Sequence, residues 1–271
     1  PHRPDVEFLE VDLTNGEAVT SAIRDCDYLF HLSAVSDLNL AVQDPIYSAK
    51  VNVLGTINTL EAARRINVKR FILASTAWVH SGFPDANPDE RSPFYVPTHA
   101  PIYASSKIAS ELFCHDYNKL FDQPFTILRY GSTYGPRMRA PLVVHAFLTK
   151  ALEGETITIF GDGMQRRNFI YVEDLARAHS MILGNEALNQ TYNVEGAISV
   201  SITEVAESIR DIMDQEVRIE YAPARSWDDT GTSVSIEKAR VELGWQPQVD
   251  LAEGLARTIN WYRERYRLNQ S

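Results

Sequence analysis

The sequence of 271 residues has few cysteines and no long apolar run. Its two cysteines, Cys26 and Cys114, lie far apart and match no metal-site spacing. A disulfide scaffold is therefore excluded, and a reduced, cytoplasmic setting is expected. Because no run reaches about 18 apolar residues, we expect neither a signal peptide nor a membrane span.

Positive charge and glycine are scarce as well. The 26 Lys and Arg residues face 36 Asp and Glu, which gives a net charge of −10 and argues against nucleic acid or an anionic membrane as partner. The 13 glycines fall below the usual share of about 7%. No GxGxxG or GxxGxxG stretch occurs, so the Gly-rich turn that normally opens a dinucleotide-binding domain is missing.

What is present is an alternation of strand and helix patterns. A continuous apolar run such as Phe71–Ala74 indicates a strand covered on both faces, as in parallel sheets. The alternation predicts an α/β fold with a Rossmann-like doubly wound parallel sheet, followed by a smaller C-terminal α+β domain. In the first half we expect strands at 6–11, 27–33, 71–74 and 124–130 and helices at 14–24, 47–66 and 102–121; in the second half, strands at 156–160 and 217–221 and helices at 172–183, 202–213, 236–243 and 251–266.

Three residues carry the candidate chemistry. Tyr103 and Lys107 are four residues apart near a predicted helix start, so they share one face. A lysine cation near a phenol stabilises the phenolate and lowers its pKa, which would let Tyr103 act as a general base. Thr76 places a hydroxyl at the carboxyl end of a predicted parallel strand, the edge at which α/β sheets bind ligands.

With these residues in place, the chain resembles the extended short-chain dehydrogenase/reductases, specifically the NAD-dependent epimerase/dehydratase family that acts on nucleotide sugars, with the UDP-glucose/UDP-galactose 4-epimerase type nearest. The motifs recur in order along nearly the whole chain. They are Asp12-Leu13, His31 to Ala34, Asn52 to Thr56, Ala74 to Thr76, Tyr103 to Lys107, Leu128 to Arg137, Gly161 to Asp174 and Leu243 to Pro247.

The resemblance implies roles for individual residues and NAD as cofactor. Tyr103 would be the catalytic base, Lys107 would bind the nicotinamide ribose, and Thr76 would bond the reacting sugar oxygen. The cofactor-binding residues would be Asp12, Leu13, Leu32, Ser33, Ala34, Asn52, Tyr103, Lys107 and Tyr130, and the substrate-binding residues Thr76, Ser132, Arg167, Arg225 and Asp228; no metal is expected.

Each assignment has a structural alternative. Tyr103 and Lys107 would otherwise be a solvated helix pair, Thr76 a strand end and Asp12 a turn acid. The two arginines would be surface ion-pair partners. His31 and Asn52 are expected to be structural rather than catalytic, and Cys114 to be packing.

Departures from the family pattern narrow the reaction. The 4,6-dehydratases of the family carry an Asp-Glu pair after the hydroxyl residue and the decarboxylases a glutamate, whereas this chain has Ala77 and Trp78, which cannot titrate. The resemblance thus favours a 4-epimerase acting through a transient 4-keto sugar. Gly131, Ser132 and His80 also replace usual family residues around the sugar site, so the sequence does not name the sugar.

Two alternatives to the epimerase stay open: another nucleotide-sugar reductase or dehydratase on the same scaffold, and a non-catalytic nucleotide-sugar binder or truncated remnant. The expected domains are 1–131 plus 167–195 for NAD and 132–166 plus 196–271 for the nucleotide sugar. A first strand, its Gly-rich turn and a second strand are missing relative to the family, so we expect a piece of a longer product. The resemblance also implies a homodimer through the helices at 47–66 and 102–121.

Overall fold

The computed structural model describes residues 5–83, 87–94, 102–140, 142–213, 216–224, 231 and 233–270. The chain divides into two compact units. The first comprises Pro1–Ser75, Ile102–Leu128 and Leu188–Gln190, and the second Thr76–Pro101, Arg129–Ala187 and Thr191–Ser271.

The first unit is built on parallel strands. Strand β1 pairs in parallel with β2, with Tyr28 opposite Arg70 and His31 opposite Leu73. Strand β2 is buried at every position, as its continuous apolar run predicts. The elements are α1 (Gly16–Ala22), β1 (Tyr28–His31), α2 (Leu38–Gln43), α3 (Pro45–Ala49), a π-helical segment (Lys50–Leu54), α4 (Gly55–Arg65), β2 (Arg70–Thr76), α5 (Tyr103–Phe121) and β3 (Phe125–Tyr130).

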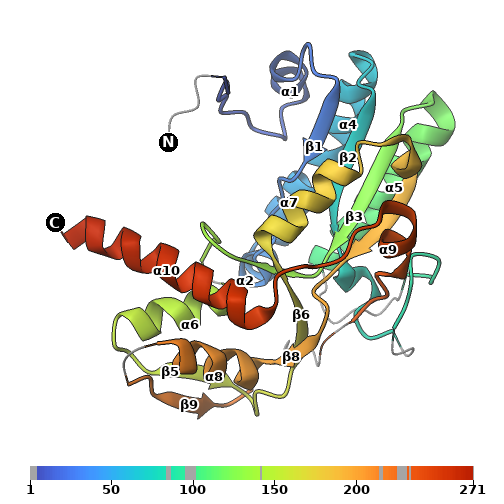
Figure 1. Cartoon of the computed structure of the whole chain (residues 1–271). Helices are drawn as coiled ribbons and strands as arrows, with labels where there is room; N and C mark the ends of the chain where they lie inside the picture. Colours follow the sequence, from blue (N-terminus) through green and yellow to red (C-terminus); the bar gives the residue numbers. More distant parts are fainter. Residues whose placement is uncertain are drawn as a thin grey trace. The chain divides into compact units, whose positions relative to one another are not determined.

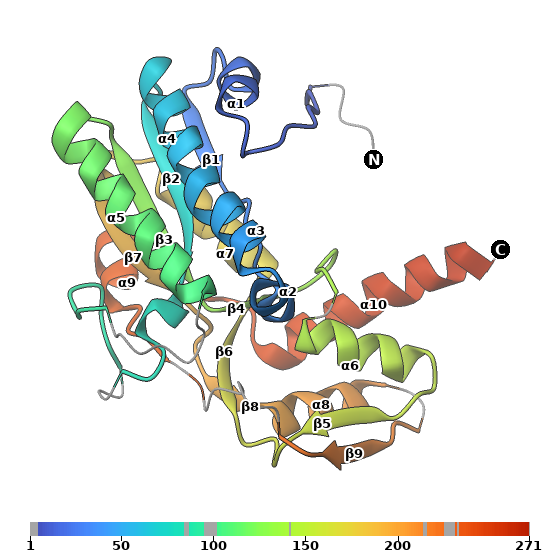
Figure 2. The same ribbon diagram turned by 180° about the vertical axis from the view of Figure 1, so that it is seen from behind.

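Figure 2 shows α4 and α5 side by side against this sheet. Their inner faces meet strand side chains in a core that contains Leu60, Phe71, Cys114 and Ile127. The strand order of the largest sheet is β1-β2-β3-β7, with β7 at Gln190–Val194. Parallel strands connected through covering helices confirm the Rossmann-like α/β class.

The second unit has its own core around α6 (Val143–Leu152), α8 (Ile202–Ile212) and α10 (Leu251–Gln270). Figure 1 shows α6 and α8 over the parallel pair β5–β9, and contacts join α8 to α10. Helix α8 starts with a capping box in which Ser201 and Glu204 satisfy each other's backbone N–H groups. The elements are a 3₁₀ turn (Ala77–His80), β4 (Ser132–Tyr134), α6 (Val143–Leu152), β5 (Ile157–Phe160), β6 (Arg166–Tyr171), α7 (Val172–Met181), a 3₁₀ turn (Asn185–Ala187), β7, β8 (Ser199–Ser201), α8 (Ile202–Ile212), β9 (Ile219–Ala222), α9 (Glu237–Leu243) and α10 (Leu251–Gln270).

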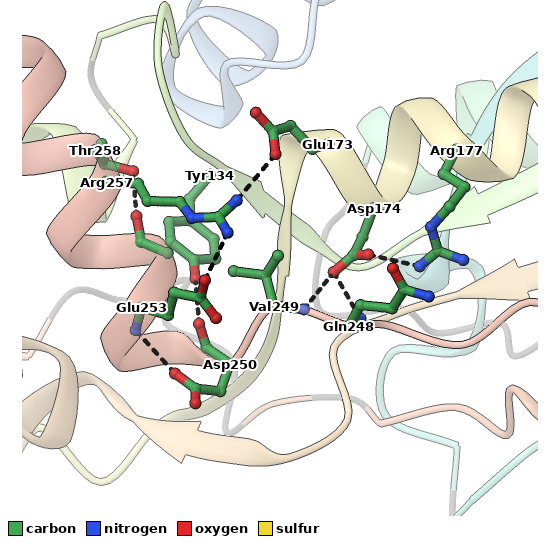
Figure 3. Close-up of polar contacts among 11 residues, drawn as sticks. Tyr134, Glu173, Asp174, Arg177, Gln248, Val249, Asp250, Glu253, Arg257 and Thr258 are labelled. Carbon is green, nitrogen blue, oxygen red and sulfur yellow. Dashed lines mark hydrogen bonds and ion pairs between the residues drawn. The ribbon is translucent and has the colours of Figure 1, made fainter.

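Asp174, on α7, ties the C-terminal segment to that helix. One carboxylate oxygen accepts from the backbone N–H groups of Gln248 and Val249, both at 2.9 Å, and the other pairs with Arg177 at 2.6 Å (Figure 3). The buried Trp245 indole donates to the Asp174 carbonyl at 3.0 Å. Two motifs that the sequence resemblance selects, the one ending at Asp174 and the one around Trp245, therefore hold each other in place.

Three sequence predictions need correction. Residues 6–11 form no strand, and Val6, Phe8 and Leu9 are exposed, because no described strand pairs with this run. The expected single helix over 47–66 is α3 and α4 separated by the π-helical segment. The helix expected at 14–24 is the shorter α1, which starts at Gly16 and is capped by the Asn15 side chain. Within the described residues, no helix is long and apolar enough to cross a membrane.

Candidate functional site

The start of α5 is strained where it presents Tyr103. Ile102, just before the helix, has φ 68° and ψ −59°, and its side chain makes no cap for the helix. A β-branched residue rarely adopts a positive φ, so the surrounding structure must enforce this conformation. Such strain is typical of functional sites, and here it sets the position of the half-buried Tyr103.

Lys107 is buried one helical turn beyond Tyr103. Its side chain is 2% exposed, and Nζ donates to the carbonyl oxygen of Ala74 in β2 at 2.8 Å. Burial lowers the pKa of Lys107 to about 8, while the charge of Glu111 opposes this shift. The structural alternative of a solvated helix pair therefore does not hold for Lys107, which is a desolvated cation at the carboxyl end of a central strand.

Asn52 fixes the segment that follows β1. Its amide accepts from Val35 N–H at 2.7 Å and donates to the Val35 carbonyl at 3.0 Å and to Ser106 Oγ at 3.0 Å. Ser106 in turn donates to the Tyr103 carbonyl at 2.7 Å. Asn52 therefore acts structurally, linking the loop after β1 to the first turn of α5.

That loop carries the predicted cofactor residues Leu32, Ser33 and Ala34. Leu32 and Ser33 are exposed although they directly follow a buried strand position. A surface left open at the carboxyl edge of a parallel strand is where a dinucleotide lies in such sheets. The residues present therefore fit this part of the cofactor.

His31, which ends β1, is buried and neutral. Its Nε2 lies 3.0 Å from Thr56 Oγ1, and its ring stacks on Phe71. Burial, together with the nearby charge of Lys107, lowers the pKa of His31 to about 3. His31 is a core histidine, as the sequence predicts.

Asp12 and Leu13 lie before α1. The Asp12 carboxylate accepts from the backbone and side chain of Thr14, both at 2.9 Å, and these hydrogen bonds lower the pKa of Asp12. Asn58 of α4 holds the Leu13 carbonyl at 2.9 Å. Asp12 thus makes the turn contact that the structural alternative predicts, and its exposed position also leaves it accessible to a ligand.

In the second unit, Thr76 is the last residue of β2 and caps the 3₁₀ turn that follows. Its Oγ1 accepts from the Trp78 N–H at 3.2 Å and it is 7% exposed. The guanidinium of Arg167 lies 5.7 Å from the centre of the Trp78 ring. A cation–π contact between residues 89 positions apart brings the predicted phosphate ligand next to the aromatic side chain that distinguishes this chain.

Tyr130 has a partner that sequence reasoning missed. Its hydroxyl lies 2.7 Å from His179 Nε2, and His179 Nδ1 lies 2.9 Å from the Leu175 carbonyl. Because Nδ1 must donate to that carbonyl, Nε2 accepts and the Tyr130 hydroxyl donates. Burial lowers the pKa of His179, which favours this neutral form.

Steric crowding explains why residue 131 is a glycine. A Cβ there would lie 2.7 Å from the Asn168 carbonyl oxygen and 2.9 Å from Cγ of Glu195. Ser132 follows and starts β4, opposite Phe169. Glu195 is 2% exposed and accepts from the Val234 N–H at 3.0 Å, and burial raises its pKa to about 8.

The structure thus gathers the predicted residues in two groups. Tyr103, Lys107 and Asn52 are connected in the first unit, whereas Trp78 and Arg167 meet in the second. Arg225 and Asp228 lie outside the described residues. Glu111, His179 and Glu195 are the polar residues that the motifs alone did not reveal.

A model of the family described as "NAD dependent epimerase/dehydratase family" matches residues 1–194. The chain belongs to this family. The chain is similar to a UDP-glucuronate 4-epimerase from Thermodesulfobacterium geofontis, with 30% identity over 98% of this chain and 82% of that protein.

Solved structures agree with the family and the fold. A UDP-glucose 4-epimerase from Thermus thermophilus, in complex with NAD, has a TM-score of 0.89 and 30% identity over 97% of this chain and 86% of that one. A dTDP-glucose 4,6-dehydratase from Streptomyces venezuelae, with NAD bound, has a TM-score of 0.91 and 26% identity over 98% and 82%. Both reactions of the NAD dependent epimerase/dehydratase family thus occur among similar proteins.

Proposed function

We propose that the protein is an NAD-dependent nucleotide-sugar 4-epimerase acting through a transient 4-keto sugar. The observation that carries the proposal is the buried Lys107 cation one turn from Tyr103, at the carboxyl end of β2. The absence of titratable side chains at Ala77 and Trp78 supports epimerisation over elimination. The 4-epimerases among the relatives support the same assignment.

The residues would act as follows. Lys107 stabilises the phenolate of Tyr103, which removes the proton from the C4 hydroxyl, and Thr76 bonds that oxygen. NAD, when bound, would accept the C4 hydride and return it to the opposite face of C4 after the 4-keto sugar has turned over. Tyr103 would return the proton to the C4 oxygen.

Binding would be divided along the chain. Residues 1–131 plus 167–195 would hold NAD, through Asp12, Leu13, Leu32, Ser33, Ala34, Asn52, Tyr103, Lys107 and Tyr130, and residues 132–166 plus 196–271 the nucleotide sugar. Arg167, Ser132, Arg225 and Asp228 are the proposed substrate ligands. Guanidinium groups suit diphosphate oxygens because their donors form a fork.

A homodimer is also proposed, through the helices at 47–66 and 102–121, which contain α4 and α5. Leu112, Leu120 and Phe121 of α5 are 50%, 67% and 48% exposed, respectively. Large apolar side chains at the surface of a helix are typical of an interface with another chain.

Elimination is the second candidate function, because Glu195 is a buried acid directly after the end of β7. Its pKa of about 8 keeps it largely protonated at neutral pH, as a general acid requires. The dehydratases among the similar proteins favour keeping this candidate.

The test is incubation with NAD and a panel of UDP-, GDP- and dTDP-sugars, followed by NMR of the products. Epimerisation gives the 4-epimer with no net consumption of NADH, elimination accumulates a 4-keto-6-deoxy sugar, and a reductase consumes NADH. Tyr103→Phe should reduce turnover at least about 100-fold while nucleotide-sugar binding persists. Unchanged turnover in Tyr103→Phe would refute the assigned base.

A further inference from the structure

A buried carboxylate lies one helical turn beyond Lys107. Glu111 is fully buried, and it shares a face of α5 with Tyr103 and Lys107 because the three are spaced four residues apart. Its Oε1 accepts from the Ser75 hydroxyl in a short hydrogen bond. None of the motifs selects Glu111.

The end of β2 therefore engages α5 twice. The carbonyl of Ala74 accepts from Lys107, and the side chain of the next residue, Ser75, donates to Glu111. Two neighbouring strand residues thus fix a cation and an anion one turn apart on the same helix. The pair lies in a core that excludes water, where an electrostatic interaction is stronger than at the surface.

Among the residues that the structure describes, the titratable groups packed around Lys107 other than Glu111 supply no countercharge. His31 of β1 is neutral because burial and Lys107 itself lower its pKa to about 3. Cys114 of α5 is a neutral thiol because burial raises its pKa. Asn52 and Thr56, which α5 meets from the π-helical segment and α4, carry no charge.

We propose that Glu111, held by Ser75, is a positioning residue that keeps the Lys107 ammonium charged and in place beside Tyr103. The inference rests on the proposed function in one respect, the role of Tyr103 as base. The electrostatic coupling of Glu111 to Lys107 does not depend on any reaction.

The pKa of Lys107 lies close to neutral pH, so a small further decrease would remove its charge. With a pKa of about 8, Lys107 is about nine-tenths protonated at neutral pH. Loss of the Glu111 charge lowers that pKa further, because the largest contribution that opposes desolvation is then gone. A neutral Lys107 no longer stabilises a phenolate at Tyr103.

The decisive measurement is the pH dependence of unfolding in Glu111→Gln, Lys107→Met and the double variant. If Glu111 sustains the charge, Glu111→Gln destabilises the protein more at about pH 7 than at about pH 10, where Lys107 is neutral in the folded state. In the Lys107→Met background this difference disappears. A loss of stability that is equal at both pH values, or additive in the double variant, overturns the proposal.

Two further variants calibrate the effect. Ser75→Ala removes the hydrogen bond and keeps the carboxylate, so it should shift the same profile in the same direction by less. Asp116→Asn removes a charge from an exposed position of the same helix and should leave the profile unchanged. A larger shift in Ser75→Ala than in Glu111→Gln would contradict the proposal that Ser75 acts through Glu111.

Turnover of UDP-glucose with NAD tests the catalytic half. The acid limb of the kcat profile should move up by about one pH unit in Glu111→Gln, since Tyr103 loses its stabilising cation. If the cycle shows coupling but Tyr103→Phe stays active, the assigned base is wrong and the coupling stands. If Tyr103→Phe is inactive and the cycle is additive, the base stands and the role of Glu111 is refuted.

Discussion

Lys107 and Asp174 are both charged and almost fully buried, yet their surroundings differ sharply. The Asp174 carboxylate accepts two backbone N–H groups and pairs with Arg177. Lys107 has one backbone carbonyl at hydrogen-bonding distance and a carboxylate one helical turn away. The contacts of Asp174 stabilise its negative charge, whereas those of Lys107 leave the pKa of this side chain well below its usual value.

The contrast separates two uses of a buried charge. A carboxylate with several donors fixes a chain segment and contributes to stability as long as every donor is present. An ammonium with a residual desolvation cost is energetically unfavourable in the folded protein and is retained because its charge is useful to a neighbouring group. The comparison predicts a large loss of stability for a substitution of Asp174, and a smaller, pH-dependent effect for a substitution of Lys107.

Asp174→Asn should have the largest effect on stability, a loss of about 3 kcal/mol, because an amide N–H₂ replaces one of the two carboxylate oxygens that together face three donors. Denaturant unfolding followed by circular dichroism measures the loss. Glu173→Gln, one position earlier and exposed, removes the same charge and should leave the midpoint nearly unchanged. Equal effects of the two substitutions would contradict the role of the Asp174 contacts.

Lys107→Met should have a smaller effect on stability and a distinctive pH dependence. In the folded protein Lys107 releases its proton at about 8, and in the unfolded chain near 10.5, so the unfolded state binds more protons between these values. Stability therefore rises with pH across this window in the natural protein, and Lys107→Met should lack that rise. Parallel stability profiles for the natural protein and Lys107→Met would contradict the comparison. Turnover in Lys107→Met should fall at least about 100-fold.

Arg257→Gln should have the smallest effect. Arg257 pairs with Glu173 at 3.0 Å and Glu253 at 2.5 Å, but its side chain is 45% exposed, at the rim of the region around Asp174 (Figure 3). Water and salt screen such pairs, so the unfolding midpoint should not change measurably. A large destabilisation would show that the rim and the buried carboxylate act as one unit.

The fold class followed from continuous apolar runs such as that of β2, and the family from the order of motifs. Strands with polar residues, such as β7, were not predicted. Its polar residues Gln190, Thr191 and Asn193 interrupt the apolar pattern that would otherwise indicate a buried strand. Residues 6–11 have a strand-like composition, but a strand also needs a partner, which composition does not reveal.

The candidate site was predictable only where a fixed spacing carried the information. Tyr103 and Lys107 are recognisable because four residues make one helical turn. The role of Glu111 depends on its hydrogen bond with Ser75, and that of His179 on its contact with Tyr130. Both contacts join residues that are far apart in the sequence. Contacts of this kind depend on packing, and no spacing rule encodes them.

The π-helical segment around Asn52 amounts to one residue more than a regular helix would need. Each residue turns an α-helix by about 100°, so this extra residue rotates every side chain before it relative to those after it. The apolar face of α3 therefore cannot be extrapolated into α4. The extra residue lies in the segment that places the buried polar side chain of Asn52 within a covering helix.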